Sequence, residues 1–219
     1  MSPITMTKKF SFSDHLIINI DTAFKTLFSK EERHTQRPTP AKGYKHQVLT
    51  AEESKHVAGL MRVNHTGEVC AQALYQGQAL TATLAEIREK MNQAADEEID
   101  HLGWCEIRLK ELNTHTSYLN PAWYALSLTI GAIAGLAGDK WSLGFVAETE
   151  KQVTHHLEEH IKQLPASDLK SLKILQQMAI DETCHAAMAL DAGGADLPPV
   201  IKFLMHSISK VMTKTSYYL

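Results

Sequence analysis

The sequence predicts an all-α fold, a four-helix bundle with further helices around it. Long stretches between residues 50 and 192 carry apolar residues at helical spacing, and we find no segment that reads as a strand. Within them the order Glu, then Glu-x-x-His, occurs twice, at 68–101 and at 150–185. This internal repeat indicates two helical hairpins of the same plan, whose four helices form the bundle.

The two Glu-x-x-His motifs provide the candidate functional residues. Positions i and i+3 of a helix share a face, so Glu98 and His101 point a carboxylate and an imidazole at one place. Glu182 and His185 do the same in the second hairpin. A carboxylate beside an imidazole suits iron or manganese, which take mixed oxygen and nitrogen ligands.

Each motif also has a lone glutamate one helix upstream, 30 residues before Glu98 and 32 residues before Glu182. These separations fit a helix, a turn and the return helix, so each pair meets across its hairpin. Four carboxylates and two imidazoles are the ligand set of ferritin-like di-iron and di-manganese bundles. The predicted metal ligands are Glu68, Glu98, His101, Glu150, Glu182 and His185. The alternative is a polar core network without metal, which would be costly to bury.

Composition bounds the class of protein. The chain has 219 residues, a net charge of −3 and no basic tract longer than Lys8-Lys9, so we expect no nucleic-acid partner. Its three cysteines are scattered and form no CxxC, which favours a reducing compartment. Residues 1–13 have neither an apolar h-region nor an arginine, so we expect no secretory signal or presequence and a cytoplasmic protein.

The first part of the chain, 1–48, is predicted to be an N-terminal helical extension and linker. Residues 14–30 form a short amphipathic helix that packs onto the bundle or contacts a membrane or partner. Residues 31–47 are a polar linker with Pro38 and Pro40, and a further Glu-x-x-His in it has no helical apolar stripe. The bundle domain is predicted to span 49–219.

The first bundle helix is predicted over 50–83. Thr50 caps it, and the Glu of a fourth Glu-x-x-His, Glu53, serves as its capping-box partner. Gly67 lies mid-helix, where glycine costs about 1 kcal/mol against alanine, and its place beside Glu68 suggests close approach of a neighbour or a ligand. His65, one turn before Glu68, is predicted to be an outer-shell or core residue rather than a seventh ligand.

The second bundle helix is predicted over 84–112. Glu89, Glu97 and Glu106 are assigned to its solvated face. Asp100 and Asp181 each neighbour a motif, and they either orient an imidazole or face solvent.

Residues 123–138 carry no charge and contain three glycines spaced for tight helix contact. The segment is shorter than the roughly 20 residues that span a bilayer. It is therefore either a buried crossover helix between the hairpins or a lipid-facing helix, and both can hold at once.

The second hairpin is predicted over 139–162 and 167–192. Glu148 lies on another face from Glu150, and His156 is a candidate second-shell residue one to two turns beyond it. A last amphipathic helix follows Pro198-Pro199, with flanking lysines and an aromatic end. It either binds a membrane interface or completes the surface of the bundle.

The six predicted ligands carry a charge of −4, so two divalent ions would leave the reduced site near neutral. This balance fits a pair of Fe(II) ions that react with dioxygen. If the pocket excludes organic substrate, the protein is a ferroxidase or peroxidase; if it admits one, an oxygenase. The apolar helices favour a substrate from a membrane, and a non-enzymatic membrane-associated helical protein is the further alternative.

Several motifs together resemble the demethoxyubiquinone hydroxylases of ubiquinone biosynthesis over residues 50–219. They are Arg62-Val63-Asn64-His65-Thr66-Gly67-Glu68, Glu98 to His101, Glu150 followed by His155-His156, Asp181-Glu182-x-x-His185 and Ser209-Lys210-Val211-Met212-Thr213. The resemblance implies hydroxylation of a 2-polyprenyl-3-methyl-6-methoxy-1,4-benzoquinol with dioxygen and two iron ions per chain. It implies that Glu98 and Glu182 bridge the irons, and no catalytic residue is predicted beyond the ligands.

The resemblance also implies a protein peripheral to the cytoplasmic face of the bacterial inner membrane, with 14–47 as the N-terminal extension of bacterial members. Eukaryotic members carry Tyr after the His pair, where this chain has Leu157. No G-x-G-x-x-G follows a strand, so electrons come from the quinol, from NADH bound in another way, or from a partner of the pathway. The sequence does not indicate the length of the substrate's prenyl tail or whether the chain forms a homo-oligomer.

Overall fold

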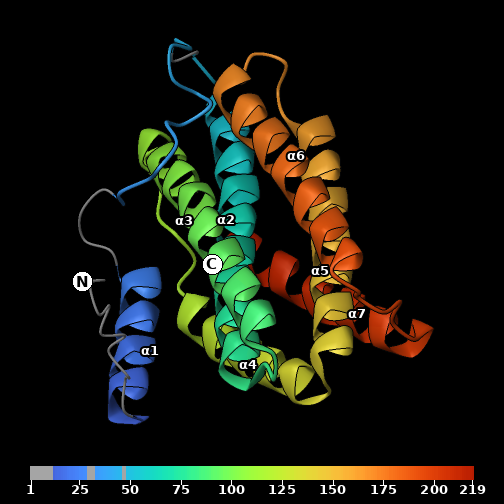
Figure 1. Ribbon diagram of the computed structural model, residues 1–219. Coiled ribbons are helices and arrows are strands. Elements are labelled where there is room, and N and C mark those ends of the chain that lie inside the picture. The colour runs from blue at the N-terminus through green and yellow to red at the C-terminus, as the bar shows by residue number, and fades with distance from the viewer. Residues whose placement is uncertain (1–11, 29–32, 46–47) are drawn as a thin grey trace, which may run out of the picture.

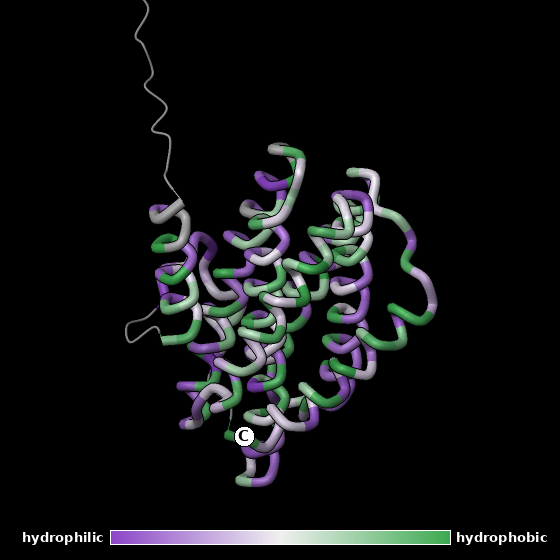
Figure 2. The backbone as a smooth tube through the Cα atoms, turned by 90° about the horizontal axis from the view of Figure 1, so that it is seen from below, coloured by the Kyte–Doolittle hydropathy of each residue, from purple (hydrophilic) through white to green (hydrophobic). Residues whose placement is uncertain are grey.

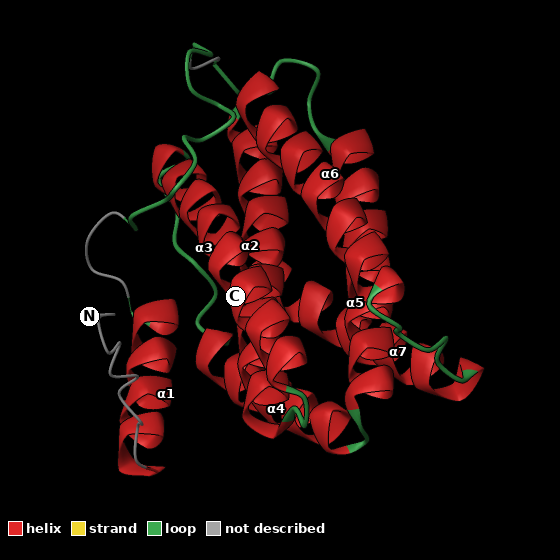
Figure 3. Ribbon diagram, viewed as in Figure 1, coloured by secondary structure: helices red, strands yellow, loops and turns green. Residues whose placement is uncertain are grey.

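The computed structural model describes residues 12–28, 33–45 and 48–219, and these residues form helices and loops without a strand (Figure 3). This confirms the all-α prediction. The described helices are α1 (Phe12–Leu27), α2 (Ala51–Thr81), α3 (Ala85–Glu111), α4 (Asn120–Leu136), α5 (Asp139–Gln163), α6 (Leu169–Asp191) and α7 (Pro199–Tyr218). The four bundle helices begin and end within two residues of the bounds that the sequence predicts. The division into 1–48 and 49–219 stays a prediction.

Two hairpins form the bundle (Figure 1). Helix α2 packs against α3, and α5 packs against α6, with further contacts of α3 with α6 and of α2 with α5. The predicted capping box starts α2: Thr50 Oγ1 accepts from Glu53 N at 3.2 Å, and Glu53 Oε2 accepts from Thr50 N at 2.8 Å. Asp168 caps α6 through Ser171 N. These caps satisfy backbone donors that the first turn of a helix leaves free.

The crossover between the hairpins is α4, which packs lengthwise against α2. A Cβ at Gly131 would meet the backbone of Leu74, and one at Gly77 would meet the backbone of Leu128 and Ala132, so glycine permits this close approach. The buried-crossover prediction is confirmed for this face. The other face exposes Leu126, Ile133 and Leu136, among other residues. Among the described residues, no helix is long and apolar enough to cross a membrane.

The C-terminal helix α7 packs against α2 and α5. It leads to the C label in Figure 2, where green marks the hydrophobic residues of the chain. Arg62, buried on α2, holds its end: Nη1 donates to Tyr217 O at 2.8 Å, and Nε donates to His115 O at 3.1 Å. The outer side of α7 leaves Val200 and Phe203 more than two-thirds exposed. The helix therefore completes the bundle on one side and presents an apolar surface on the other.

The N-terminal helix α1 rests against α2 and α4, where Gln76 Nε2 donates to Asn19 Oδ1 at 2.7 Å. Its predicted apolar stripe does not all turn inward, since Ile17, Ile20 and Phe24 are exposed. The prediction that α1 packs onto the bundle is thus confirmed, but part of its apolar stripe is exposed.

Two apolar clusters flank a polar layer in the middle of the bundle. One contains Met61, Trp104, Leu157 and Met178, and the other contains residues of 71–91, 143–147 and 189. Along each of the four bundle helices, the predicted ligands lie between these two clusters. The ligands are therefore held on regular helix backbone with packed side chains on both sides, which fixes their positions.

Candidate metal centre

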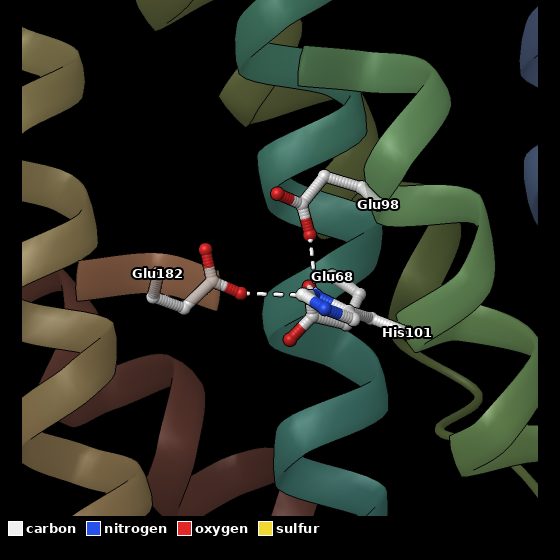
Figure 4. A group of neighbouring side chains, drawn as sticks. All are labelled: Glu68, Glu98, His101 and Glu182. Carbon is white, nitrogen blue, oxygen red and sulfur yellow. Dashed lines mark hydrogen bonds and ion pairs between the residues drawn. The ribbon is translucent and has the colours of Figure 1, made fainter. Parts of the chain in front are cut away.

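The six predicted ligands come from the four bundle helices and are all buried. The most exposed of them, His185, is 4 % exposed. Four of them, Glu68, Glu98, His101 and Glu182, each offer a ligand atom within 4.8 Å of one another, and Figure 4 shows these side chains converging. The structure therefore brings together side chains that lie up to 114 residues apart in the chain.

Both imidazoles point Nδ1 at carboxylates from both hairpins. His101 Nδ1 lies 2.9 Å from Glu98 Oε2, 3.0 Å from Glu182 Oε1 and 3.6 Å from Glu68 Oε2. His185 Nδ1 lies 3.0 Å from Glu182 Oε2 and 3.2 Å from Glu98 Oε1. Glu98 and Glu182 thus each lie between the two imidazoles, where a carboxylate would have to lie to bridge two metal ions.

The sixth predicted ligand, Glu150, belongs to α5 of the second hairpin. Tyr75 OH donates to its Oε1, and its charge interacts with those of Glu98, Glu182 and His185. Tyr75 is fully buried, and a buried phenol usually finds a hydrogen-bond partner. This role could not be predicted from the sequence, because Tyr75 lies on a helix face that reads as ordinary core.

Burial and crowding shift the pKa values of these groups. Burial raises the pKa of Glu68 and Glu150, and the neighbouring carboxylates raise it further. Burial alone would lower the pKa of His185, but hydrogen bonds to Glu182 and Glu98 and their charges outweigh it and raise that pKa to about 12. The pKa of His101 is raised against the effect of burial by the charges of Glu98 and Glu182. Binding of a metal ion to these groups would therefore release protons.

Two buried oxygens support a fit between this cluster and cations. Glu98 Oε1 and Glu182 Oε1 have no hydrogen-bond partner among the described residues, although an imidazole Nδ1 lies within 3.2 Å of each. A buried carboxylate oxygen without a donor is costly unless a cation approaches it. The mixed oxygen and nitrogen set matches the preference of iron and manganese. The identity of the ligands stays a prediction.

The outer nitrogen of each imidazole binds a carboxylate of the opposite hairpin. His101 Nε2 lies 3.0 Å from Asp181 Oδ2, and His185 Nε2 lies 2.7 Å from Glu97 Oε2. Such outer-shell carboxylates fix the tautomer and orientation of a ligating imidazole. The suggestion that Asp181 orients an imidazole is confirmed. Glu97, which was assigned to the solvated face, has a 40 % exposed side chain and also contacts His185. Both acids directly precede the Glu of their motif, a repeat signal that the sequence contained.

The linker contributes to this outer layer through Arg37. Its Nη1 lies 2.8 Å from Asp181 Oδ2, its Nε lies 2.8 Å from Asp100 Oδ2, and its guanidinium stacks 4.9 Å from the Trp104 ring. Asp100 therefore anchors Arg37, and the alternative that it orients an imidazole is not what the structure shows. Nothing in a polar, proline-containing linker predicted this contact.

The two histidines predicted to lie outside the ligand set have different surroundings. His65 is buried, and its ring nitrogens lie 3.4 Å from Glu106 Oε1 and 3.3 Å from Asn120 Nδ2, which makes it a core residue one turn from Glu68. Glu106 also pairs with Arg33 at 2.8 Å, so its assignment to the solvated face was wrong. The exposed Glu89 fits that assignment.

His156 instead borders a cavity. Its Nε2 lies 3.0 Å from Ser209 Oγ of α7, and burial together with His155 and His206 lowers its pKa. The cavity, which we call cavity 1, has a volume of about 260 Å³ and is lined from α2, α4, α5 and α7. Its lining is mostly apolar and includes Glu68, so it reaches the ligand cluster. The apolar residues of the lining include Leu74, Ile130, Phe145, Leu204, Ile208 and Met212.

A second cavity, cavity 2, reaches the cluster from the other side. It has a volume of about 350 Å³, and its lining includes Tyr75, Glu97 and His185. Charged side chains, among them Lys90 and Asp191, also border it. The cluster thus has an apolar approach at Glu68 and a more polar approach at His185.

Sequence comparisons identify a family and relatives that this chain resembles. The model of a family described as "Ubiquinone biosynthesis protein COQ7" matches residues 55–216. A protein of Legionella pneumophila (strain Corby), named 3-demethoxyubiquinol 3-hydroxylase, is 57 % identical over 209 residues, covering 95 % of this chain and 98 % of the relative. A protein of the same name from Acinetobacter baumannii (strain ATCC 17978) is 60 % identical over 206 residues, covering 94 % and 97 %.

Proposed function

We propose that this chain, which belongs to the COQ7 family of ubiquinone biosynthesis proteins, hydroxylates the ring of 3-demethoxyubiquinol. The observation that carries the proposal is the 57–60 % identity, over nearly the whole of each chain, to relatives with this name. The buried Glu/His cluster beside an apolar cavity supplies a site for such chemistry. The protein is accordingly an oxidoreductase.

The metal of the proposed enzyme is a pair of iron ions. Glu68, Glu98 and His101 would hold one ion, Glu150, Glu182 and His185 the other, and Glu98 and Glu182 would bridge them. The support is the donor set and the two carboxylate oxygens without hydrogen-bond partners. Bound iron would supply the binding and reduction of dioxygen, which no amino-acid side chain provides.

The proposed reaction exchanges a ring C–H bond for a C–OH bond. One oxygen atom of dioxygen enters the ring, and the other leaves as water with two protons and two electrons from a reductant. The quinol itself, NADH or a partner protein is the candidate reductant. Cavity 1 would hold the quinol, because its apolar walls exclude water while its inner end reaches Glu68.

The prenyl tail of the substrate fits the outer part of cavity 1, where α7 contributes Ile201, Leu204 and Ile208. A ferroxidase needs no such apolar approach, which favours the hydroxylase over that alternative. Phe203 and Val211 of α7 lie outside the lining of cavity 1 and are exposed, and lysines of the same helix lie beside them. We therefore propose peripheral binding of α7 to the cytoplasmic face of the inner membrane, whose anionic lipids attract lysines.

The first test combines metal content with turnover. The full chain is purified with iron, its iron per chain is counted, and it receives a short-tailed demethoxyquinol, dioxygen and a reductant. We expect two irons per chain and a product heavier by one oxygen atom, with ¹⁸O from ¹⁸O₂. Two irons that turn over peroxide or mineralise iron, with the quinol unchanged, would contradict the hydroxylase and favour a ferroxidase or peroxidase. A chain that binds no metal would contradict both.

Membrane binding has a separate test. Sedimentation with vesicles that contain anionic phospholipid should capture the protein, and vesicles of neutral phospholipid should capture less. Replacing Phe203 and Val211 with serine should abolish capture without changing the turnover of a short-tailed quinol. Equal capture of this variant would contradict the assignment of the membrane surface to α7.

A further inference from the structure

Two buried hydrogen-bond donors in the lining of cavity 1 have no partner among the described residues. They are Asn64 Nδ2 on α2 and Trp123 Nε1 on α4. Asn64 is 6 % exposed, so its amide nitrogen is out of reach of bulk solvent. A buried donor left without an acceptor costs free energy, and an acceptor held in an adjoining cavity would remove that cost.

The orientation of Asn64 is set by a neighbour. His160 Nδ1 lies 2.7 Å from Asn64 Oδ1, and burial lowers the pKa of His160 to about 4, so the ring is neutral near pH 7. Its Nδ1–H donates to Oδ1, which leaves the amide N–H bonds for another acceptor. Cavity 1 is the space beside Asn64 in which such an acceptor would lie.

The wall next to Asn64 leaves room for a flat group. Gly67 follows Asn64 by three residues and lines the same cavity. A Cβ built on Gly67 meets no atom within 4 Å, whereas one on Gly59 or Gly77 would overlap a neighbour. The sequence-based suggestion of a close neighbour at Gly67 is therefore wrong, and the alternative of a ligand stays a prediction.

We propose that Asn64 and Trp123 form the subsite that binds the head group, donating hydrogen bonds to oxygen atoms on the ring of a quinol or quinone that lies against Gly67. Both groups are donors only in this arrangement, and such a ring offers several oxygen acceptors around its edge. The subsite deepens the proposed function and rests on it. It holds the ring beside Glu68, at the inner end of cavity 1.

The test uses variants that remove one donor group each: Asn64→Asp keeps the shape of the side chain, and Trp123→Phe keeps an aromatic ring. Trp123→Phe removes the indole donor, and Asn64→Asp removes the amide donor while it keeps an acceptor for His160. Thr154→Val is the matched control, because Thr154 Oγ1 is also buried without a partner but lies outside the lining of cavity 1. Iron content and thermal midpoint are measured for each variant to show that it is folded and loaded.

The probes are a short-tailed demethoxyquinone and a hydrocarbon with the same tail on a toluene ring, which has no ring oxygen. We expect Trp123→Phe and Asn64→Asp each to weaken quinone binding by about tenfold, to raise the KM for quinol more than they lower kcat, and to bind the hydrocarbon like the unaltered chain. Thr154→Val should bind both probes normally.

Two results would contradict the proposed subsite. Either both variants bind quinone as tightly as Thr154→Val does, or both lose the hydrocarbon as strongly as the quinone, which would point to altered shape. An unaltered chain that binds no quinone would instead refute the proposed function, and the subsite with it.

Discussion

The two hairpins contribute equivalent ligands, but their outer surroundings differ. Behind His101, Asp181 has a 15 % exposed side chain and is held by Arg37 of the linker. Behind His185, Glu97 has a 40 % exposed side chain and borders cavity 2. The first imidazole is thus closed in by a third segment of the chain, while the second faces an accessible side of the bundle.

A repeat in the sequence thus forms a site that is asymmetric in its outer contacts. The outer nitrogen of each imidazole is held by a carboxylate of the opposite hairpin, so each hairpin depends on the other for this contact. The asymmetry arises from segments outside the repeat: the linker on one side, and α4 with α7 over cavity 1 on the Glu68 side. We expect the two halves to respond unequally when equivalent residues are changed.

The largest effect is expected where the halves meet. Glu182→Ala removes a carboxylate that lies 3.0 Å from both imidazoles, so iron should fall from two to less than one per chain. Helix content by circular dichroism should persist, because the apolar clusters above and below are unchanged. Glu89→Ala, an exposed glutamate of α3, is the control and should keep its iron. Full iron content in Glu182→Ala would refute the shared-ligand arrangement.

A smaller and unequal effect is expected for the outer carboxylates. Asp181→Asn should weaken metal affinity by about 10–100-fold, the usual result of losing an outer-shell partner. Glu97→Gln should weaken it less, because water can replace a half-exposed carboxylate behind His185. Competition with a chelator measures both affinities. Equal losses would show that the enclosure by Arg37 has no energetic consequence.

A further comparison concerns two glycines of α2, Gly67 and Gly77. Gly67 precedes Glu68 and lines cavity 1, as Thr149 does before Glu150. Gly67→Ala should stabilise the chain by about 1 kcal/mol, because the new Cβ meets nothing. It should also raise the KM for quinol, since the methyl group enters the cavity. Gly77→Ala should instead destabilise the chain, because its Cβ would overlap the backbone of α4. Thermal unfolding and steady-state kinetics check both variants, and an unchanged KM in Gly67→Ala would argue against a ring at that wall.

A pH-dependent effect is expected at the link between the hairpins, where His160 bonds Asn64. Its pKa is about 4 in the folded chain, below the ordinary value near 6.5. The unfolded chain therefore binds a proton that the folded chain does not, and stability present above pH 6.5 is lost as the pH falls toward 4. The loss is at most on the order of 3 kcal/mol. The difference in unfolding free energy between the unaltered chain and His160→Gln should shrink over this range, and a constant difference would contradict the assignment.

The helices, and the positions of the six predicted ligands along them, could be predicted from local sequence patterns. Helical periodicity is a local property, and the i, i+3 spacing of each motif places its two side chains together in any helix. The lengths of 30 and 32 residues then allow a single antiparallel return in each hairpin. The family resemblance was visible for the same reason, because it depends on motifs in order along the chain.

The side chains that lie behind and beside those ligands depend on tertiary packing and could not be predicted in this way. Glu97 and Glu106 look like solvated residues on a helix, but packing of α3 directs them to His185 and to Arg33 with His65. Arg37 reaches the centre from a linker with no periodic pattern, and Tyr75 meets Glu150 across the bundle. Such contacts depend on how helices cross and where a loop returns, and neither is encoded in the spacing of residues within one segment. For the same reason, the donors that border cavity 1 became visible only when α2 and α4 were placed side by side.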